Sequence, residues 1–525
     1  MDVKGMGARL SAWTARCRKN KTQICTQGQF YCLAVGVAMY VLGLILAQWN
    51  NALYNISLVG EFSVFLCCVF FCFADLKNRF LLLSFDLVTF VFLMCRPLLN
   101  LLMGRMWYRH FAPDAVIFAV TCVPVSMMAM GFGTWLHEKQ FLSKWLGKKK
   151  KAPVLTELSM VPFRQNLKDF RLVAGAFYLF TMAFFLLGEL DKLSYMAGRD
   201  YNEFYSGYVP DYPFFVGTFA AMMPYVLCAY LASLPSKPLS FCALALYVLS
   251  AAPQFLIGIR NPIVLNALTA LMYYLLRDYL GDRKLWMGKF EKRMLLIALP
   301  LAAFGLSALN YLRSGKGGEM AELGFFGAIV DLFYKQGVSF NVLALGFSAI
   351  PNLIGGNKCF TLGPFIDYLT QNRIGRVLFD SPALGSGNTI TRAVYGNNFS
   401  HSMSLISHED YLAGNGWGSS YILELFADFG WVGLVLGSVL LGWLLAVMVS
   451  GFRRGWFGRT VILIGLTDLF FVPRAEATGW LLFLAQPHFW LAMAACVVGT
   501  WICTKIRFRH WIPALRNKWK RQTGA

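Results

Sequence analysis

The sequence is poor in charged residues. Asp, Glu, Lys and Arg together account for only 14% of its 525 residues, whereas hydrophobic residues account for 57% and the mean hydropathy is +0.53. A soluble protein of this length needs far more charge on its surface, which excludes a soluble globular class. Repeated apolar runs of about 20 residues have the length of a helix that crosses the hydrocarbon core of a bilayer.

Several short motifs are also missing. The sequence contains no CxxC pair, and His401 and His408 stand near two carboxylates at a spacing that matches no HExxH-type signature, so no metal is expected. It has no internal repeat and no convincing DxD-type nucleotide-sugar site. Most of the 13 cysteines lie in apolar runs, and Cys359 is the only one in the segment 312–429, which predicts no structural disulfide there. No cofactor is expected.

The apolar runs predict the fold class. The basic N-terminus leads into a full-length span, from Phe30 to about Ala47, without an A-x-A-like exit, so we expect no cleavable signal peptide. We predict an all-α polytopic membrane protein with about twelve transmembrane helices, near 30–47, 56–74, 80–103, 114–135, 172–189, 213–232, 239–258, 262–276, 294–311, 430–450, 460–473 and 479–503.

The net charge is +21, and the distribution of its Lys and Arg residues among the loops predicts the orientation of the spans. If the N-terminus is cytoplasmic, most Lys and Arg residues fall in the inside loops, including the run Lys148–Lys151 and the tail from Lys505 to Arg521. This positive-inside bias predicts a multi-pass membrane protein with both termini cytoplasmic. The basic patches therefore face anionic membrane lipids, and no nucleic acid partner is expected.

Three regions follow from this topology. Residues 1–311 form an N-terminal membrane bundle of about nine helices with a basic cytoplasmic loop at 137–172, and residues 430–525 form C-terminal membrane helices with a basic cytoplasmic tail. Between them, residues 312–429 form an exterior loop that is too long for a passive linker.

Part of this exterior loop is itself apolar. Charged and polar residues interrupt Leu323–Ile354 near its middle, which makes an uninterrupted span unfavourable. We expect short amphipathic helices that lie in the membrane interface or fold back against the bundle.

Ionisable residues near apolar runs cost several kcal/mol at the bilayer centre unless they face the bundle interior or water. Glu61, Asp86 and Arg96 are expected to pair with one another inside the bundle. Arg260 lies at an exterior turn before a helix that starts with Pro262. Arg474 follows a short span and a proline, and an interrupted span of this kind can admit water and polar ligands.

The exterior side gathers both cations and carboxylates. Its arginines are suited to phosphate, because a guanidinium donates two parallel hydrogen bonds to a pair of oxygens. They predict an anionic ligand, although each could instead snorkel or form a structural ion pair. The arginines are Arg260, Arg313, Arg392 and Arg474, and the carboxylates are Glu409, Asp410, Glu424, Asp428 and Glu476.

The stretch "GNGWGSSYILELFADFGWVGLVLG" (414–437) places Ser420, Glu424 and Asp428 four residues apart on one helix face. Carboxylates at this spacing repel each other. The repulsion can raise the pKa of one of them, which suits a general base. The alternative is that both pair with arginines and only seat the helix. We favour Glu424, displayed to an exterior groove, as the base; Glu409 is its main rival, and an arginine partner is the simpler role for Asp428.

The "GIRNP" turn, the late exterior loop, "NGWGSSYILELFADFGWVGLVLG" and "PRAEA" together resemble Wzy-type O-antigen and capsular polysaccharide polymerases. The resemblance implies a GT-C-type glycosyltransferase of the bacterial plasma (inner) membrane. Such an enzyme transfers an oligosaccharide from undecaprenyl pyrophosphate onto the next lipid-linked repeat unit, for O-antigen, capsule or exopolysaccharide, and a chain-length regulator is a possible partner. The pyrophosphate and glycan would contact the four arginines, Glu476, His401, His408 and Tyr421.

Two other functions stay open. An O-antigen ligase moves a finished glycan to a different acceptor, and the Wzy-like motif favours the polymerase over it. A lipid-linked oligosaccharide flippase or transporter usually places charges at the midplane of its spans and shows repeated halves, whereas this chain concentrates its charges in one exterior loop.

The topology is directly testable. We expect reporter fusions after Gly318 and Gly416 to give exterior signals, and a fusion after Gly147 to give a cytoplasmic signal, because the Lys and Arg bias orients the spans. A cytoplasmic signal at Gly416 would overturn an exterior site.

Overall fold

The computed structural model describes residues 3–140, 167–199, 208–281, 285–313, 317–356, 358–385 and 387–505. These residues form helices and turns, with no strand among them. Eleven of the described helical stretches are long and apolar enough to cross a membrane, which confirms an all-α polytopic membrane protein. The chain divides into two compact units, each described by itself. The first contains residues 1–150, 296–450 and 470–479, and the second contains 151–295, 451–469 and 480–525.

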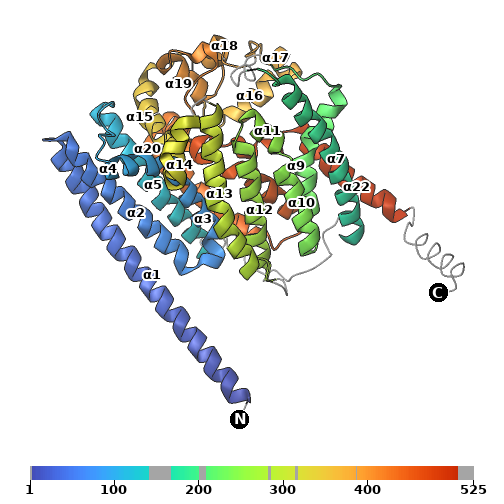
Figure 1. Cartoon of the computed structure of the whole chain (residues 1–525), viewed down its shortest axis with the longest axis horizontal. Helices are drawn as coiled ribbons and strands as arrows, with labels where there is room; N and C mark the ends of the chain where they lie inside the picture. Colours follow the sequence, from blue (N-terminus) through green and yellow to red (C-terminus); the bar gives the residue numbers. More distant parts are fainter. Residues whose placement is uncertain are drawn as a thin grey trace, which may run out of the picture. The chain divides into compact units, whose positions relative to one another are not determined.

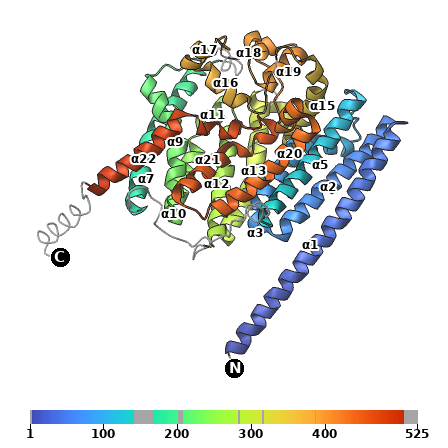
Figure 2. The same ribbon diagram turned by 180° about the vertical axis from the view of Figure 1, so that it is seen from behind.

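The first unit contains a bundle of long helices. Figures 1 and 2 show α1 running alongside α2, and a side chain at Gly60 of α2 would come within 2.5 Å of the backbone nitrogen of Tyr40 in α1. Small residues allow this close approach where lipid provides no hydrophobic drive between helices. The helices of the bundle are α1 (Val3–Ala47), α2 (Tyr54–Ala74), α3 (Leu76–Thr89), α4 (Cys95–Leu102), α5 (Pro113–Glu138) and α20 (Tyr421–Gly451). A π-helical turn, η2 (Phe90–Met94), joins α3 to α4.

Helices α5 and α20 pack in direct backbone contact. A side chain at Gly442 would overlap the carbonyl oxygen of Met130, and one at Gly133 would overlap that of Val439. The Thr134 hydroxyl donates to the Gly442 carbonyl oxygen at 2.9 Å. This contact fixes α20, which carries the "YILELFAD" stretch, against the bundle.

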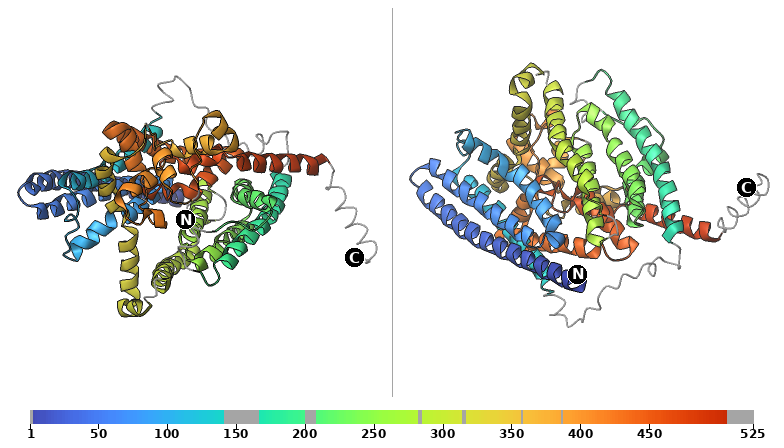
Figure 3. Two further views of the ribbon diagram at one scale, coloured as in Figure 1. Left: turned by 90° about the horizontal axis from the view of Figure 1, so that it is seen from above. Right: turned by 60° about the horizontal axis from the view of Figure 1, so that its bottom comes forward.

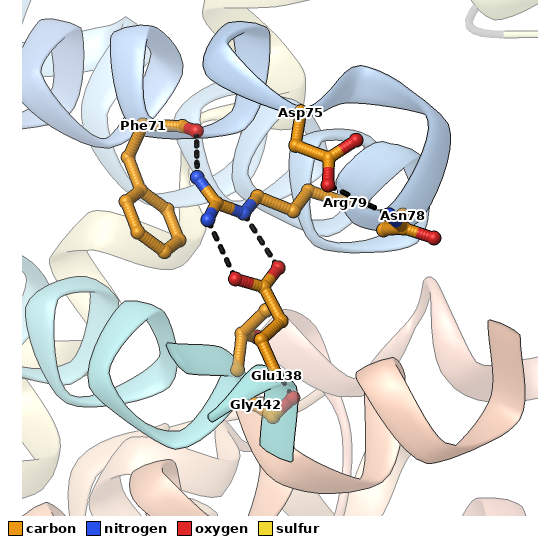
Figure 4. A network of polar contacts seen from close by, with 7 residues as sticks. Phe71, Asp75, Asn78, Arg79, Glu138 and Gly442 are labelled. Carbon is orange, nitrogen blue, oxygen red and sulfur yellow. Dashed lines mark hydrogen bonds and ion pairs between the residues drawn. The ribbon is translucent and has the colours of Figure 1, made fainter. Parts of the chain in front are cut away.

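An ion pair ties α3 to the last turn of α5. The Arg79 guanidinium donates to both carboxylate oxygens of Glu138, at 2.7 and 2.6 Å, and to the Phe71 carbonyl oxygen at 2.5 Å (Figure 4). The guanidinium carbon of Arg79 lies 3.8 Å from the centroid of the Phe71 ring. The bidentate geometry makes this pair a specific clamp between the two helices.

The expected pairing of Glu61 and Asp86 with Arg96 is wrong. Glu61 is fully buried, and among the described residues neither of its carboxylate oxygens has a hydrogen-bond partner. Asp86 accepts a hydrogen bond from the Cys72 thiol at 3.9 Å. Arg96 instead lies over the ring of Tyr334. Sequence position cannot tell which face of a span a charged residue occupies, so it did not identify these partners.

The segment that precedes α20 folds into short helices of the first unit. Helix α15 packs against α5, which is the folded-back arrangement expected from its interrupted apolar run. The helices are α14 (Gly317–Gln336), α15 (Ser339–Ala349), α16 (Gly363–Gln371), α17 (Arg373–Leu378), α18 (Ile390–Tyr395) and α19 (Phe399–Ser407), and α13 (Lys289–Arg313) leads into them. Figures 1 and 2 both show α15, α18 and α19 at one end of the bundle.

The second unit is built from α7 (Leu167–Tyr195), α9 (Phe214–Ala232), α10 (Lys237–Leu249), α11 (Ala252–Ile257), α12 (Asn261–Leu280), α21 (Trp456–Leu469) and α22 (Pro487–Lys505). Helix α9 contacts α7, α21 and α22, and Figure 3 shows the green helices α7 and α9 side by side. The span expected at 262–276 is α12, which is not among the eleven membrane-length stretches. The span expected at 479–503 starts later, at Pro487, because the 3-10 turn η7 (Gly479–Leu484) comes first.

The contact between α5 and α20 predicts a sharp difference between two glycine substitutions. Gly442→Ala should lower the thermal unfolding temperature of the detergent-solubilised chain, because its methyl group meets the Met130 carbonyl. Gly131→Ala is the matched control on α5, since its nearest neighbour would be a Phe71 ring carbon at 4.0 Å. The control should be neutral or slightly stabilising, as Ala favours helix over Gly by about 1 kcal/mol. Equal unfolding temperatures for both variants would contradict this packing.

Candidate active site

Glu424 lies in the first turn of α20 and is 0% exposed. One of its carboxylate oxygens accepts from the Ser419 hydroxyl at 2.7 Å, and the other accepts from the Ala477 backbone N–H at 2.7 Å. The expectation that the helix displays Glu424 to an open groove is therefore wrong. The carboxyl group is enclosed and joins two segments of the first unit that are about fifty residues apart in the sequence.

Asp428 lies one turn further along α20 and is partly exposed. It accepts from the backbone N–H groups of Phe360 and Thr361, at 3.0 and 2.6 Å, and from the Cys359 thiol at 3.7 Å. The expected arginine partner is wrong, because backbone amides supply the donors. A carboxylate held by amides is strongly hydrogen-bonded without an ion pair.

The helix changes direction immediately after these carboxylates. Gly430 has φ 61° and ψ −156°, which interrupts the helical backbone inside α20. Only glycine adopts this conformation without strain. The interruption divides α20 into a short segment that carries Glu424 and Asp428 and a longer segment that packs against α5.

Further hydrogen bonds close the network around the two carboxylates. The Thr478 hydroxyl donates to the Thr361 carbonyl oxygen at 2.6 Å, which joins the segment that binds Glu424 to the loop that binds Asp428. The Asn398 amide donates to Glu476 at 2.8 Å and its oxygen caps α19. The loop 359–361, the start of α20 and the segment 474–478 therefore form one polar cluster, which we call the carboxylate cluster.

The cluster brings the two motif segments together. A side chain at Gly418, in "NGWGSS", would lie 3.9 Å from the Arg474 side chain of "PRAEA". The Arg474 guanidinium donates to the Gln336 side-chain oxygen at 3.1 Å and lies 5.9 Å from the Phe92 ring centroid. Glu476 and Asp428 are the charged neighbours of Glu424. Arg474 therefore belongs to the same short segment as Glu476 and as the Ala477 amide that binds Glu424.

A second group of polar residues lies between α18 and α19. The ring nitrogen Nδ1 of His401 lies 3.0 Å from the Tyr411 hydroxyl, which donates to the Thr389 carbonyl oxygen at 3.1 Å. Burial, and then the charge of Arg392, lower the pKa of His401 to about 4. The imidazole is therefore neutral at pH 7, and it offers a ligand a hydrogen bond rather than a charge. Arg392 donates to the Gly387 carbonyl oxygen at 3.3 Å.

The remaining sequence-predicted residues lie in other surroundings. Glu409 is exposed in the turn after α19, and the His408 ring lies tilted at 59° to that of Trp417 with centroids 5.3 Å apart. Tyr421 is buried, and its hydroxyl lies 2.7 Å from that of Ser126 on α5. Arg260 precedes α12 in the second unit, and Arg313 closes α13 with its side chain outside the described residues.

Sequence reasoning missed several residues of this region. Ser419 and the backbone amides of Phe360, Thr361 and Ala477 hold the two carboxylates, and a backbone donor leaves no signature in a sequence. Lys358 was also missed: its ammonium donates to the Ala393 carbonyl oxygen at 2.7 Å and to the Ser402 hydroxyl at 2.9 Å. Burial lowers the pKa of Lys358, although Asp367 opposes this shift.

No metal is indicated by this geometry. Within the residues that the structure describes, no group of three or more His, Cys, Asp or Glu side chains is placed to hold a metal ion. The available chemistry is that of carboxyl groups, hydroxyls and arginines at one end of a membrane bundle. Carboxyl groups transfer protons, and arginines bind phosphate groups.

These features define a multi-pass helical membrane protein in which a buried carboxyl group, two partly exposed carboxyl groups and an arginine form one cluster. The family model for the O-antigen polysaccharide polymerase Wzy matches residues 30–507, and the chain belongs to this family. Its members are polymerases that act on polysaccharide repeat units. Comparison with curated proteins gave no significant match, and comparison with solved structures gave none.

Proposed function

We propose that this polymerase joins oligosaccharide repeat units carried on undecaprenyl pyrophosphate, at the exterior face of the bacterial plasma membrane. The donor lipid pyrophosphate is released in each cycle. Family membership supports the reaction class. The observation that carries the proposal for this chain is Glu424, a fully buried carboxyl group held between the two motif segments by Ser419 and Ala477.

The reaction forms one glycosidic bond and breaks one. The acceptor hydroxyl attacks the anomeric carbon of the donor sugar, the bond from that carbon to pyrophosphate breaks, and the hydroxyl proton must leave. In this proposal Glu424 accepts the proton. Each of its oxygens receives one hydrogen bond, and a carboxylate oxygen has lone pairs for a second. In the part of the chain that the structure describes, no Lys or Arg forms an ion pair with Glu424.

Asp428 positions the loop in this scheme. Its two amide hydrogen bonds fix residues 360–361, and Thr478 connects that loop to the segment that binds Glu424. Loss of Asp428 would free the loop at 360–361 from the cluster without removing the base. Glu409, which is exposed, remains the rival base because an open turn can approach an acceptor sugar.

The leaving pyrophosphate requires cations. Arg474 is the first candidate, because it lies three residues before Ala477 and beside Gly418. Arg260, Arg313 and Arg392 stay as proposed phosphate contacts, and Glu476, His401 and His408 as proposed glycan contacts. The Tyr421 hydroxyl contacts Ser126, so its part in the proposal is to hold the start of α20 against α5.

Near-isosteric carboxyl variants test the proposed base. Polymer formation from purified lipid-linked repeat units should fall by about 10²- to 10⁴-fold in Glu424→Gln, the range for loss of a general base. Binding of the lipid-linked substrate should be retained. Asp428→Asn should lower the thermal unfolding temperature, because it weakens two charge-assisted hydrogen bonds.

Glu409→Gln is the matched control, since it makes the same chemical change at an exposed position. It should polymerise at near the parental rate. A fully active Glu424→Gln together with an inactive Glu409→Gln would transfer the role of base to Glu409. Transfer of a single glycan to a different acceptor, without chain growth, would indicate the ligase reaction instead.

A further inference from the structure

Two arginines of the first unit converge on one aromatic ring. The guanidinium carbon of Arg96 lies 4.5 Å from the centroid of the Tyr334 ring, and that of Arg105 lies 5.8 Å from the same centroid. The two carbons are therefore no more than about 10 Å apart, the sum of these distances. Neither arginine forms an ion pair with a carboxylate in the part of the chain that the structure describes.

The surroundings of Arg96 make this arrangement costly without a ligand. Arg96 is partly buried in the membrane-length stretch Leu76–Leu102, where an uncompensated charge is unfavourable. The charge of Arg105, which is exposed in the turn after α4, repels it. Glu61 and Asp86, the carboxylates expected to neutralise Arg96, do not contact it.

The backbone fixes the ring between these side chains. A side chain at Gly337 would come within 2.6 Å of the Arg96 Cβ atom, so only glycine lets the end of α14 lie directly on α4. The Gly337 N–H donates to the Phe333 carbonyl oxygen at 3.0 Å, which closes the last turn of α14. Tyr334, in that turn, is thus held where both guanidinium groups can stack on it.

Arg474 lies at the same end of α14. It donates to Gln336, two residues after Tyr334, and its guanidinium lies 5.9 Å from the ring of Phe92, which is four residues before Arg96. Arg474 also begins the segment that contributes the Ala477 hydrogen bond to Glu424. Arg474 therefore connects the end of α14, where the paired arginines lie, to the segment that binds Glu424.

The end of a helix gives a simpler explanation, which accounts for only part of this arrangement. Carbonyl groups at a helix C-terminus attract cations, but this attraction is weak near solvent. It does not explain why three arginines gather at one helix end. Stacking on an aromatic ring orients each guanidinium without neutralising it. A ligand with two adjacent negative groups would neutralise the pair, and guanidinium forks match phosphate oxygens in geometry.

We propose that Arg96 and Arg105, oriented by Tyr334, form a binding site with Arg474 for the diphosphate headgroup of a lipid carrier. The proposal rests on the proposed function, which supplies a lipid-linked diphosphate, and it identifies residues of the first unit that hold that group. Free pyrophosphate shares the chemistry, and the lipid tail distinguishes the two.

The experiment measures binding of undecaprenyl diphosphate to the full chain in nanodiscs, and separately of inorganic pyrophosphate, without turnover. Arg105→Gln should weaken lipid diphosphate binding about tenfold or more, the expected effect of losing a charge-assisted hydrogen bond. Arg96→Gln should do the same. Arg109→Gln is the matched control, since Arg109 is exposed four residues further along the same turn. It should bind like the parental chain.

Arg105→Gln keeps the test decisive if Arg96→Gln does not fold, because Arg105 is exposed. Parental binding in a folded Arg105→Gln chain would overturn the proposal, and so would an equal loss in Arg109→Gln, which would indicate nonspecific attraction. Arginine-dependent binding of pyrophosphate with no binding of the lipid diphosphate would overturn the lipid assignment. Glu424→Gln should bind the lipid diphosphate normally. If Glu424 is not the base, this binding result does not change. If the arginines do not bind the diphosphate, the polymerisation test of Glu424 does not change.

Discussion

The site depends on which groups donate hydrogen bonds to the buried carboxyl group of Glu424. Burying a carboxyl group without hydrogen bonds is unfavourable by several kcal/mol, so the chain must bring donors to it. Ser419 supplies one from the turn before α20, and the Ala477 amide supplies the other from a segment about fifty residues later. Thr478 and Asp428 then fix the loop at 359–361. Glu424, Asp428 and Thr478 together therefore fix the relative positions of three separate segments.

The membrane bundle provides the rigid support for this cluster. Backbone contact at Gly133 and Gly442 seats the long part of α20 against α5, and Ser126 joins Tyr421 and Ser438 by 2.7 Å hydrogen bonds along the same contact. The break at Gly430 leaves the short first segment of α20 free to take a different direction. Precise positioning of a reacting group requires this kind of support, because a displacement of about 1 Å can cost about a hundredfold in rate.

The sequence predicted the parts of this structure that depend on composition and local pattern. Hydropathy identified the eleven membrane-length stretches and also predicted a span at α12, which is not among them. The motifs at 414–437 and 473–477 are neighbours in space. It failed where tertiary contacts decide. The donors to Asp428 are backbone amides rather than an arginine, Glu424 is enclosed rather than displayed, and Arg96 stacks on Tyr334 rather than pairing with Asp86. Charge type can be read from a sequence, but the face that a side chain occupies and the backbone groups that approach it cannot.

The central claim is that chain growth occurs at the carboxylate cluster. The most direct measurement is a cryo-electron microscopy map of the full chain in nanodiscs with an unreactive analogue of the lipid-linked repeat unit. The account predicts density for the diphosphate beside Arg474 at the end of α14, and for the adjoining sugar within hydrogen-bonding distance of Glu424. Density for the headgroup and sugar on a face of the chain remote from Glu424 and Arg474 would contradict it.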